Sequence, residues 1–293
     1  MVSFWATLPV SLRAIITGIV IALLPANVWP LLLTSVGVPL AATIEVIFLG
    51  LYVWWTSGGG PPEKTQIARG LAFRSGALSP AQCFWGIIAA LSFAATIHGA
   101  IVLLFRFVPF PTEAFRHGYD LSFIPSLPLR WIAVVVSATS AGICEETGFR
   151  GYMQQSIEQR HGALIAILVS SFFFMLLHLT KAWAMIGMVP IVFGAGVLLG
   201  LLAWSSGSLI PGMIGHVVMD IGLFAYWWTG IAGDFTARPI TETGVDQPFR
   251  ITCAVLATTL TIVLLAAWRL RRLRVSTTVP SNQSPAANGS TAP

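Results

Sequence analysis

Long apolar stretches alternate with short polar ones along almost the whole chain. About eight of these stretches approach the ~20 residues that a helix needs to cross the hydrocarbon core of a bilayer. They cover residues 14–33, 38–56, 81–104, 131–145, 163–179, 184–204, 209–228 and 251–268. Continuous apolar runs of this length are not strands, because a membrane barrel has short segments of alternating hydrophobicity. The pattern predicts an all-α fold, a polytopic transmembrane helix bundle of about eight spanning helices.

The composition excludes an ordinary soluble domain. Hydrophobic residues make up 56% of the 293 residues, charged residues make up only 9%, and the mean hydropathy is +0.81. A soluble domain has a polar shell in which about a quarter of all residues are charged. The net charge of +5 is concentrated after the last apolar stretch, in Arg269, Arg271, Arg272 and Arg274. Such a cluster marks the cytoplasmic side and contacts anionic headgroups, so we expect membrane lipids as partners and no nucleic acid.

The charges in the loops predict how the bundle is oriented. An even number of spans places both termini on one side, and the arginine cluster predicts that this side is cytoplasmic. Five more basic residues fall on the same side, namely Lys64, Arg69, Arg74, Arg150 and Arg160. The opposite side receives the acidic residues Asp234, Glu242 and Asp246, but also the arginines Arg106, Arg116 and Arg130. The charge rule is thus obeyed in part, and we expect a multi-pass protein of a prokaryotic plasma membrane with both termini cytoplasmic.

A few ionisable residues interrupt the apolar segments. Charge at such depth is costly, so these side chains usually face a bundle interior or a water-filled cavity. Glu145 and Glu146 are adjacent, and Arg150 follows Glu146 at a spacing of four. On a helix Glu146 and Arg150 face each other and can pair as an orienting brace. Glu145 points about 100° away around the helix, where a carboxylate suits the role of general base for water.

Two later segments carry histidines at helical spacing. His178 lies one turn after Phe174, and His216 lies one turn before Asp220, so each pair shares a helix face. A carboxylate four residues away fixes the tautomer and the orientation of a histidine. Taken singly, each histidine would more often be a packed hydrogen-bonding residue. Together with Glu145, the three segments could converge on one water molecule. The chain has neither the zinc motif HExxH nor a convincing serine triad.

The three patterns together resemble a known family. Residues 145–150 read E-E-x-x-x-R, residues 174–178 read F-x-x-x-H, and residues 216–220 read H-x-x-x-D. In this order, and on consecutive hydrophobic helices, they resemble the motifs of the CPBP family, which comprises CAAX prenyl proteases and bacteriocin-processing, abortive-infection-type membrane proteins. The resemblance covers roughly residues 131–228. It implies an intramembrane endopeptidase that hydrolyses a membrane-associated protein or peptide, either as a metalloprotease or with glutamate alone.

The resemblance also implies a role for each residue. Glu145 would activate the hydrolytic water, His178 would assist, and Glu146 with Arg150 would brace the site. His216 and Asp220 would bind a metal or stabilise the oxyanion. Many members have asparagine at the last position, and an ionised aspartate cannot donate a hydrogen bond to an oxyanion. Asp220 therefore favours either a protonated acid or a divalent metal such as zinc, held by Glu145, His178, His216 and Asp220.

Two other functions fit the same chain. A non-proteolytic immunity or binding scaffold would keep the fold and sequester a peptide, although every proposed catalytic position is retained. A proton-coupled transporter would also use buried acids and histidines, but it would show internal repeats, and the sequence has none. We divide the chain into N-terminal transmembrane helices and an interfacial loop (1–130), a CPBP-like catalytic core (131–230), a loop with the last transmembrane helix (231–274) and a disordered polar tail (275–293).

Overall fold

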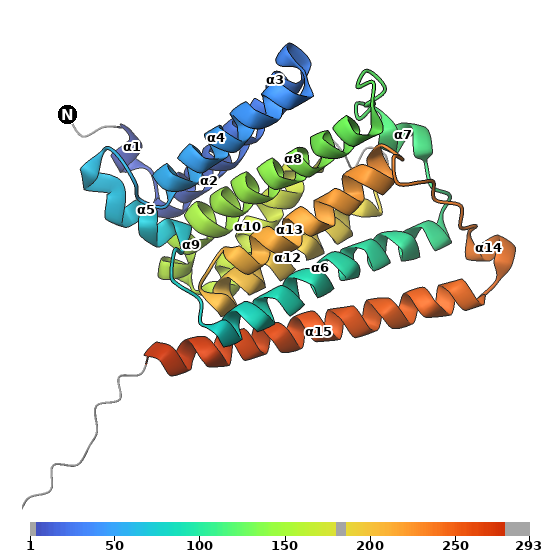
Figure 1. The fold of residues 1–293 in the computed structure, drawn as a ribbon. Helices are drawn as coiled ribbons and strands as arrows, with labels where there is room; N and C mark the ends of the chain where they lie inside the picture. The colour runs from blue at the N-terminus through green and yellow to red at the C-terminus, as the bar shows by residue number, and fades with distance from the viewer. Residues whose placement is uncertain (1–3, 180–185, 279–293) are drawn as a thin grey trace, which may run out of the picture.

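The computed structural model describes residues 4–179 and 186–278, and the regular structure of these residues is helical (Figure 1). The elements are α1 (Phe4–Thr7), α2 (Val10–Ala26), α3 (Val28–Val36), α4 (Val38–Thr56), η1 (Glu63–Thr65), α5 (Gln66–Phe73), α6 (Pro80–Phe107), α7 (Thr112–Arg116), α8 (Leu127–Glu145), η2 (Glu146–Met153), α9 (Gln154–His161), α10 (Ala163–Leu177), α12 (Met188–Ser206), α13 (Ile210–Gly222), η3 (Leu223–Trp228), α14 (Ile240–Thr243) and α15 (Gln247–Thr278). The predicted all-α class is confirmed.

Seven helical segments of the described residues are long and apolar enough to cross a membrane. They are Val10–Val36, Val38–Thr56, Pro80–Phe107, Leu127–His161, Met188–Ser206, Ile210–Trp228 and Gln247–Arg274. The remaining predicted span, residues 163–179, corresponds to α10, which is apolar but has only 15 residues. The first residues of the predicted 184–204 span, and residues 279–293 of the predicted tail, lie outside the described residues. The multi-pass helical bundle predicted from the sequence is thus confirmed.

The helices pack as a series of layers (Figure 1). α15 lies along α6, α6 contacts α13, and α13 in turn contacts α8. The N-terminal helix α2 packs against η2 and α8, while α10 pairs with α12. The largest hydrophobic cluster joins α6, α12, η3 and α15 through buried side chains such as Phe93, Phe105, Leu199 and Trp227. This cluster forms the main hydrophobic core of the bundle.

Local sequence signals explain where several of these helices begin and end. Ser79 and Gln82 form a reciprocal capping box at the start of α6, and Pro80 occupies its first turn. Pro25 lacks a backbone N–H for the helix, and α2 ends one residue later at Ala26. Asn27 then separates α2 from α3. Gly37 separates α3 from α4. Its φ is +79°, a conformation that glycine adopts at little conformational cost. These breaks divide the N-terminal region into α2, α3 and α4, which pack on the α8 side of the bundle.

The three arginines that ran against the charge rule each have a polar partner in the structure. Arg106 Nη2 lies 2.8 Å from Asp246 Oδ2, and Arg116 pairs with Asp234. Arg130 Nε donates to the carbonyl oxygen of Ile124 at 2.9 Å. Two of the three arginines are therefore paired with acids of the same loop region.

α2 and η2 cross at very short range through two glycines. A Cβ atom on Gly148 would lie 2.4 Å from the carbonyl oxygen of Gly18, and one on Gly18 would lie 2.8 Å from the carbonyl oxygen of Gly148. Ala22 lies at the same crossing. Small residues let membrane helices approach backbone to backbone, where van der Waals packing drives their association. The first span is therefore held directly against the segment that follows the glutamate pair.

We expect Gly148→Ala to destabilise the protein by about 1–3 kcal/mol, the usual cost of overpacking. The added methyl group meets backbone atoms of α2, which cannot rotate away as a side chain can. Gly194→Ala is the matched control, because a Cβ there meets no atom within 4 Å. It should be neutral or stabilising by up to about 1 kcal/mol. Thermal unfolding in detergent checks both, and equal melting temperatures for the two variants would contradict the close crossing.

Candidate active site

The glutamate pair lies at a change of helix type. Glu145 is the last residue of α8, and Glu146 begins the π-helical segment η2, which continues into α9 without a break. π-helical turns inside α-helices are rare and frequently occur at functional sites. The Glu145 side chain is 13% exposed, whereas that of Glu146 is fully buried. The two neighbouring acids therefore face different environments, and Glu145 is the one that reaches a cavity.

Glu146 and Arg150 form the predicted pair. Arg150 Nη1 lies 2.9 Å from Glu146 Oε1, and neither side chain has any exposed surface. The guanidinium also donates to the carbonyl oxygen of Gly196 at 3.3 Å. Its central carbon lies 4.3 Å from the ring centre of Phe174, a cation–π contact. Arg150 thus connects η2 to α10 and α12, as a brace would.

The same carboxylate also holds a histidine. Nδ1 of His216 lies 2.9 Å from Glu146 Oε1, the oxygen that accepts from Arg150. Since a carboxylate oxygen accepts, Nδ1 is the donor in this bond. Glu146 Oε2 has no hydrogen-bond partner among the described residues, and a Cβ on Gly212 would come within 3.0 Å of it. Gly212 was not identified from the sequence, although it stands one turn before His216 and so shares its face.

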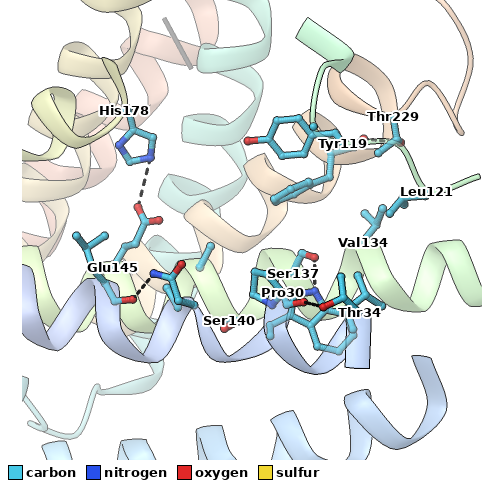
Figure 2. A pocket seen from close by; sticks show the side chains of 18 of the residues that line it. Pro30, Thr34, Tyr119, Leu121, Val134, Ser137, Ser140, Glu145, His178 and Thr229 are labelled. Carbon is cyan, nitrogen blue, oxygen red and sulfur yellow. Dashed lines mark hydrogen bonds and ion pairs between the residues drawn. The ribbon is translucent and has the colours of Figure 1, made fainter. Parts of the chain in front are cut away.

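His178 is fixed by its own helix. Its Nδ1 lies 2.7 Å from the carbonyl oxygen of Phe174, one turn earlier in α10. Nδ1 is therefore the donor, and Nε2 is left to face Glu145 Oε2 at 3.6 Å (Figure 2). This separation is too long for a direct hydrogen bond, but it suits two atoms that share one water molecule.

His216 directs its second nitrogen to the same place. Nε2 of His216 lies 4.0 Å from Glu145 Oε2 and 3.6 Å from Asp220 Oδ2. The Nε2 atoms of both histidines therefore face one oxygen of Glu145. All six residues singled out in the sequence come together in one cluster, which joins α8, η2, α10 and α13. Their chemical roles stay predictions.

The cluster lies where two cavities meet. The wide cavity, of about 520 Å³, lies between α2, α3, α8 and the loop that precedes α8 (Figure 2). The narrow cavity, of about 80 Å³, lies between α6, α12 and α13 and has a mostly apolar lining. Glu145 and His178 line both cavities, whereas His216 and Asp220 line only the narrow one. Glu145 is therefore open to the wide cavity as well as to the narrow one.

The N-terminal helices form one wall of the wide cavity. Asn27 and Thr34 line it from the α2–α3 break and from α3, and Ser137 and Ser140 line it from α8. Ser140 Oγ also donates to Glu45 Oε1 of α4 at 2.7 Å. The two residues lie 95 positions apart, so helical spacing could not have paired them. The wall could not be identified from the three motifs, which all lie after residue 144.

The predicted metal ligands are close to one another in pairs. Their polar atoms are 3.6–4.0 Å apart where Glu145 and Asp220 face the histidines. Among the residues that the structure describes, however, no group of three or more His, Cys, Asp or Glu side chains is placed to hold a metal ion. The side chains as arranged do not fit a metal centre, and metal binding stays a prediction.

Comparison with known proteins gives a family match in the middle of the chain. Residues 125–222 match the family model described as Type II CAAX prenyl endopeptidase Rce1-like. The match contains all six clustered residues and ends with α13. Neither the curated proteins nor the solved structures gave a match to this chain. The family match confirms the resemblance seen in the motifs and supports intramembrane endopeptidase activity in general.

Proposed function

We propose that this chain, a membrane protein with an Rce1-like segment at residues 125–222, hydrolyses a peptide bond of a membrane-associated protein or peptide through a water activated by Glu145 and His178. One observation carries the proposal: Glu145 Oε2 faces Nε2 of both His178 and His216 at the boundary of the two cavities. A water molecule there would lie against a carboxylate and a histidine nitrogen that accepts hydrogen bonds.

Glu145 acts as the general base in this mechanism. It takes one proton from water while the water oxygen bonds to the carbonyl carbon, and the carbonyl electron pair moves onto oxygen. Glu145 then gives the proton to the amide nitrogen as the C–N bond breaks, which releases an amine and a carboxylic acid. His178 orients the water, because its Nδ1–H is held by the Phe174 carbonyl and Nε2 therefore accepts.

His216 and Asp220 face the position where negative charge develops. Glu146 fixes the His216 ring through Nδ1, so Nε2 is aimed at the narrow cavity. When Nε2 carries a proton, it donates toward the oxyanion, and a protonated Asp220 does the same. Donors held in place before the reaction need no reorganisation during it. Arg150 contributes indirectly, by holding Glu146.

The proposal is tested by cleavage with the purified protein in lipid nanodiscs. The substrates are a library of lipidated and transmembrane peptides, and the products are identified by mass spectrometry. We expect cleavage of at least one class and a product with a free amine at the new terminus. Failure to cut any member of either class would contradict an endopeptidase.

Chelation separates the glutamate route from the metal-assisted one. We expect cleavage to persist after dialysis against a strong chelator, because the Glu145 route needs only water. Loss of activity that returns with added zinc, and not with magnesium, would instead support metal binding by Glu145, His178, His216 and Asp220. Metal content of the same samples, measured by mass spectrometry, is the control for complete removal.

A further inference from the structure

α13 lies closely along α6, and glycines on both helices make this approach possible (Figure 1). A Cβ on Gly86 of α6 would come within 3.1 Å of the Pro211 side chain, and one on Gly215 of α13 within 3.2 Å of the Ala90 backbone. Small residues of this kind let membrane helices pack backbone to backbone. Apolar packing has little direction, so it does not by itself fix how α13 is rotated or shifted along α6.

A histidine of α6 adds a directional contact between the two helices. Nε2 of His98 lies 3.1 Å from the carbonyl oxygen of Met219 in α13. Nε1 of Trp227, in η3, donates to His98 Nδ1 at 3.2 Å. Because an indole N–H only donates, Nδ1 is the acceptor and Nε2 carries the proton that is donated to Met219. His98 thus joins α6, α13 and η3, with both ring nitrogens used.

Gly222 makes room for the His98 ring. A Cβ at this position would come within 2.6 Å of His98 Cε1. Gly222 is the last residue of α13, and the helical path continues as the π-helical segment η3. π-helical turns frequently occur at functional sites. Both the histidine contact and the change of helix type therefore lie within three residues of Asp220.

The hydrogen bond from His98 acts on the backbone that carries Asp220. The carbonyl of Met219 belongs to the planar peptide group that joins Met219 to Asp220. A bond to this carbonyl therefore helps to fix the direction in which the Asp220 side chain extends. Asp220 Oδ2 lies 3.6 Å from His216 Nε2 and lines the narrow cavity, whereas His98 lines neither active-site cavity.

We propose that His98 is a positioning residue for Asp220, which it holds toward the developing oxyanion by fixing the peptide group between Met219 and Asp220. This inference rests on the proposed endopeptidase function. A histidine that only joined helices would affect stability when it was replaced. A positioning histidine also affects the chemical step, because a misplacement of about 1 Å can cost about 10²-fold in rate.

The first test compares two replacements of His98 by kinetics in nanodiscs. His98→Leu removes both hydrogen bonds, and we expect it to lower kcat by at least about tenfold. KM should change less than about twofold, because His98 lines neither cavity. His98→Gln should keep most of the activity, since its amide can donate to Met219 and accept from Trp227. Equal losses of kcat in the two variants would overturn the proposal.

A double-mutant cycle separates the positioning of Asp220 from a general loss of structure. Single-turnover rates are measured for His98→Leu with and without Asp220→Ala. In the Asp220→Ala background we expect His98→Leu to lower the rate less than about twofold, because the group that it positions is already gone. A loss as large as in the protein with Asp220 would overturn the proposal.

Gly222→Ala disturbs the same contact while His98 stays in place. The added methyl group would displace the ring, so we expect kcat to fall by about tenfold or more. Gly99→Ala is the matched control, because a Cβ beside His98 on α6 would meet Leu256 only at an ordinary 3.6 Å. Equal kcat in these two variants would overturn the proposal even if His98→Leu failed to fold.

The contact also has a readout that needs no substrate. In protein labelled with ¹⁵N-histidine, the His98 signal is identified by its loss in His98→Gln. We expect it to show the proton on Nε2, whereas Nδ1 is the donor in His178 and His216. A proton on Nδ1 of His98 would overturn the proposal. No cleavage by the unaltered protein would refute the endopeptidase function and the positioning role with it, whereas cleavage that His98→Leu leaves unchanged would refute the positioning role alone.

Discussion

Glu145→Gln should lower the rate of cleavage by about 10²–10⁴-fold, the usual contribution of a general base. Glutamine has nearly the shape of glutamate, so its side chain can occupy the same position beside His178. It cannot accept a proton from water, and this function is what the proposed mechanism needs. Initial rates at saturating substrate, measured for both proteins in the same nanodiscs, give the ratio.

Glu45→Gln is the matched control for this variant. Glu45 is likewise an acid of a spanning helix, but it is fully buried and lines neither active-site cavity, and its Oε1 accepts a hydrogen bond from Ser140. Its replacement removes a buried acid of α4, and we expect a change in rate of less than about fivefold. Full activity in Glu145→Gln, or equal losses in the two variants, would show that the catalytic group is elsewhere.

Most of the fold could be predicted from the sequence because hydropathy alone decides where a helix can cross lipid. All eight apolar stretches correspond to helices of the structure, although the helices often extend beyond the predicted ranges. α8 is an example: the prediction ended at the glutamate pair, but the helical path continues through η2 and α9 to His161. Charged residues end an apolar run, yet they do not end a helix if they are paired inside the bundle, as Glu146 and Arg150 are.

From the sequence, only the contacts between site residues four positions apart on one helix could be predicted. Spacing of four placed Glu146 beside Arg150 and His216 near Asp220, and both contacts are present in the structure. The contact between Glu146 and His216 joins residues 70 positions apart, and no local pattern indicates it. The resemblance of the three motifs to the CPBP family indicated that their segments converge. It did not indicate which nitrogen of each histidine faces Glu145.

The role of the N-terminal helices was outside what the motifs could show. Gly18 is an unremarkable glycine in an apolar run, and its importance depends on the carbonyl oxygens that approach it across the α2–η2 crossing. The break at Asn27 likewise lies in the wall of the wide cavity, which Asn27 lines. Both features come from tertiary packing, which a sequence of apolar residues with similar hydropathy does not specify.

Arg150→Met should be the most destabilising of the variants considered, by about 3–5 kcal/mol, because it leaves a buried carboxylate without its cation. Glu146 would keep only the bond from His216, and the cation–π contact with Phe174 would be lost as well. The measurement is the free energy of unfolding in mixed micelles, with the melting temperature as a second readout.

Arg116→Met provides the comparison for the buried pair. Arg116 pairs with Asp234 at the surface, where the two side chains are 29% and 69% exposed, and exposed pairs contribute about 0–1 kcal/mol. The double variant Glu146→Gln with Arg150→Met should recover part of the stability lost in Arg150→Met, since no buried charge is left uncompensated. If the single and double variants were equally unstable, the loss would come from the packing of the guanidinium against Phe174. Arg150 would then stabilise the site through packing and not through its charge. The position of His216 would depend on its hydrogen bond to Glu146 alone.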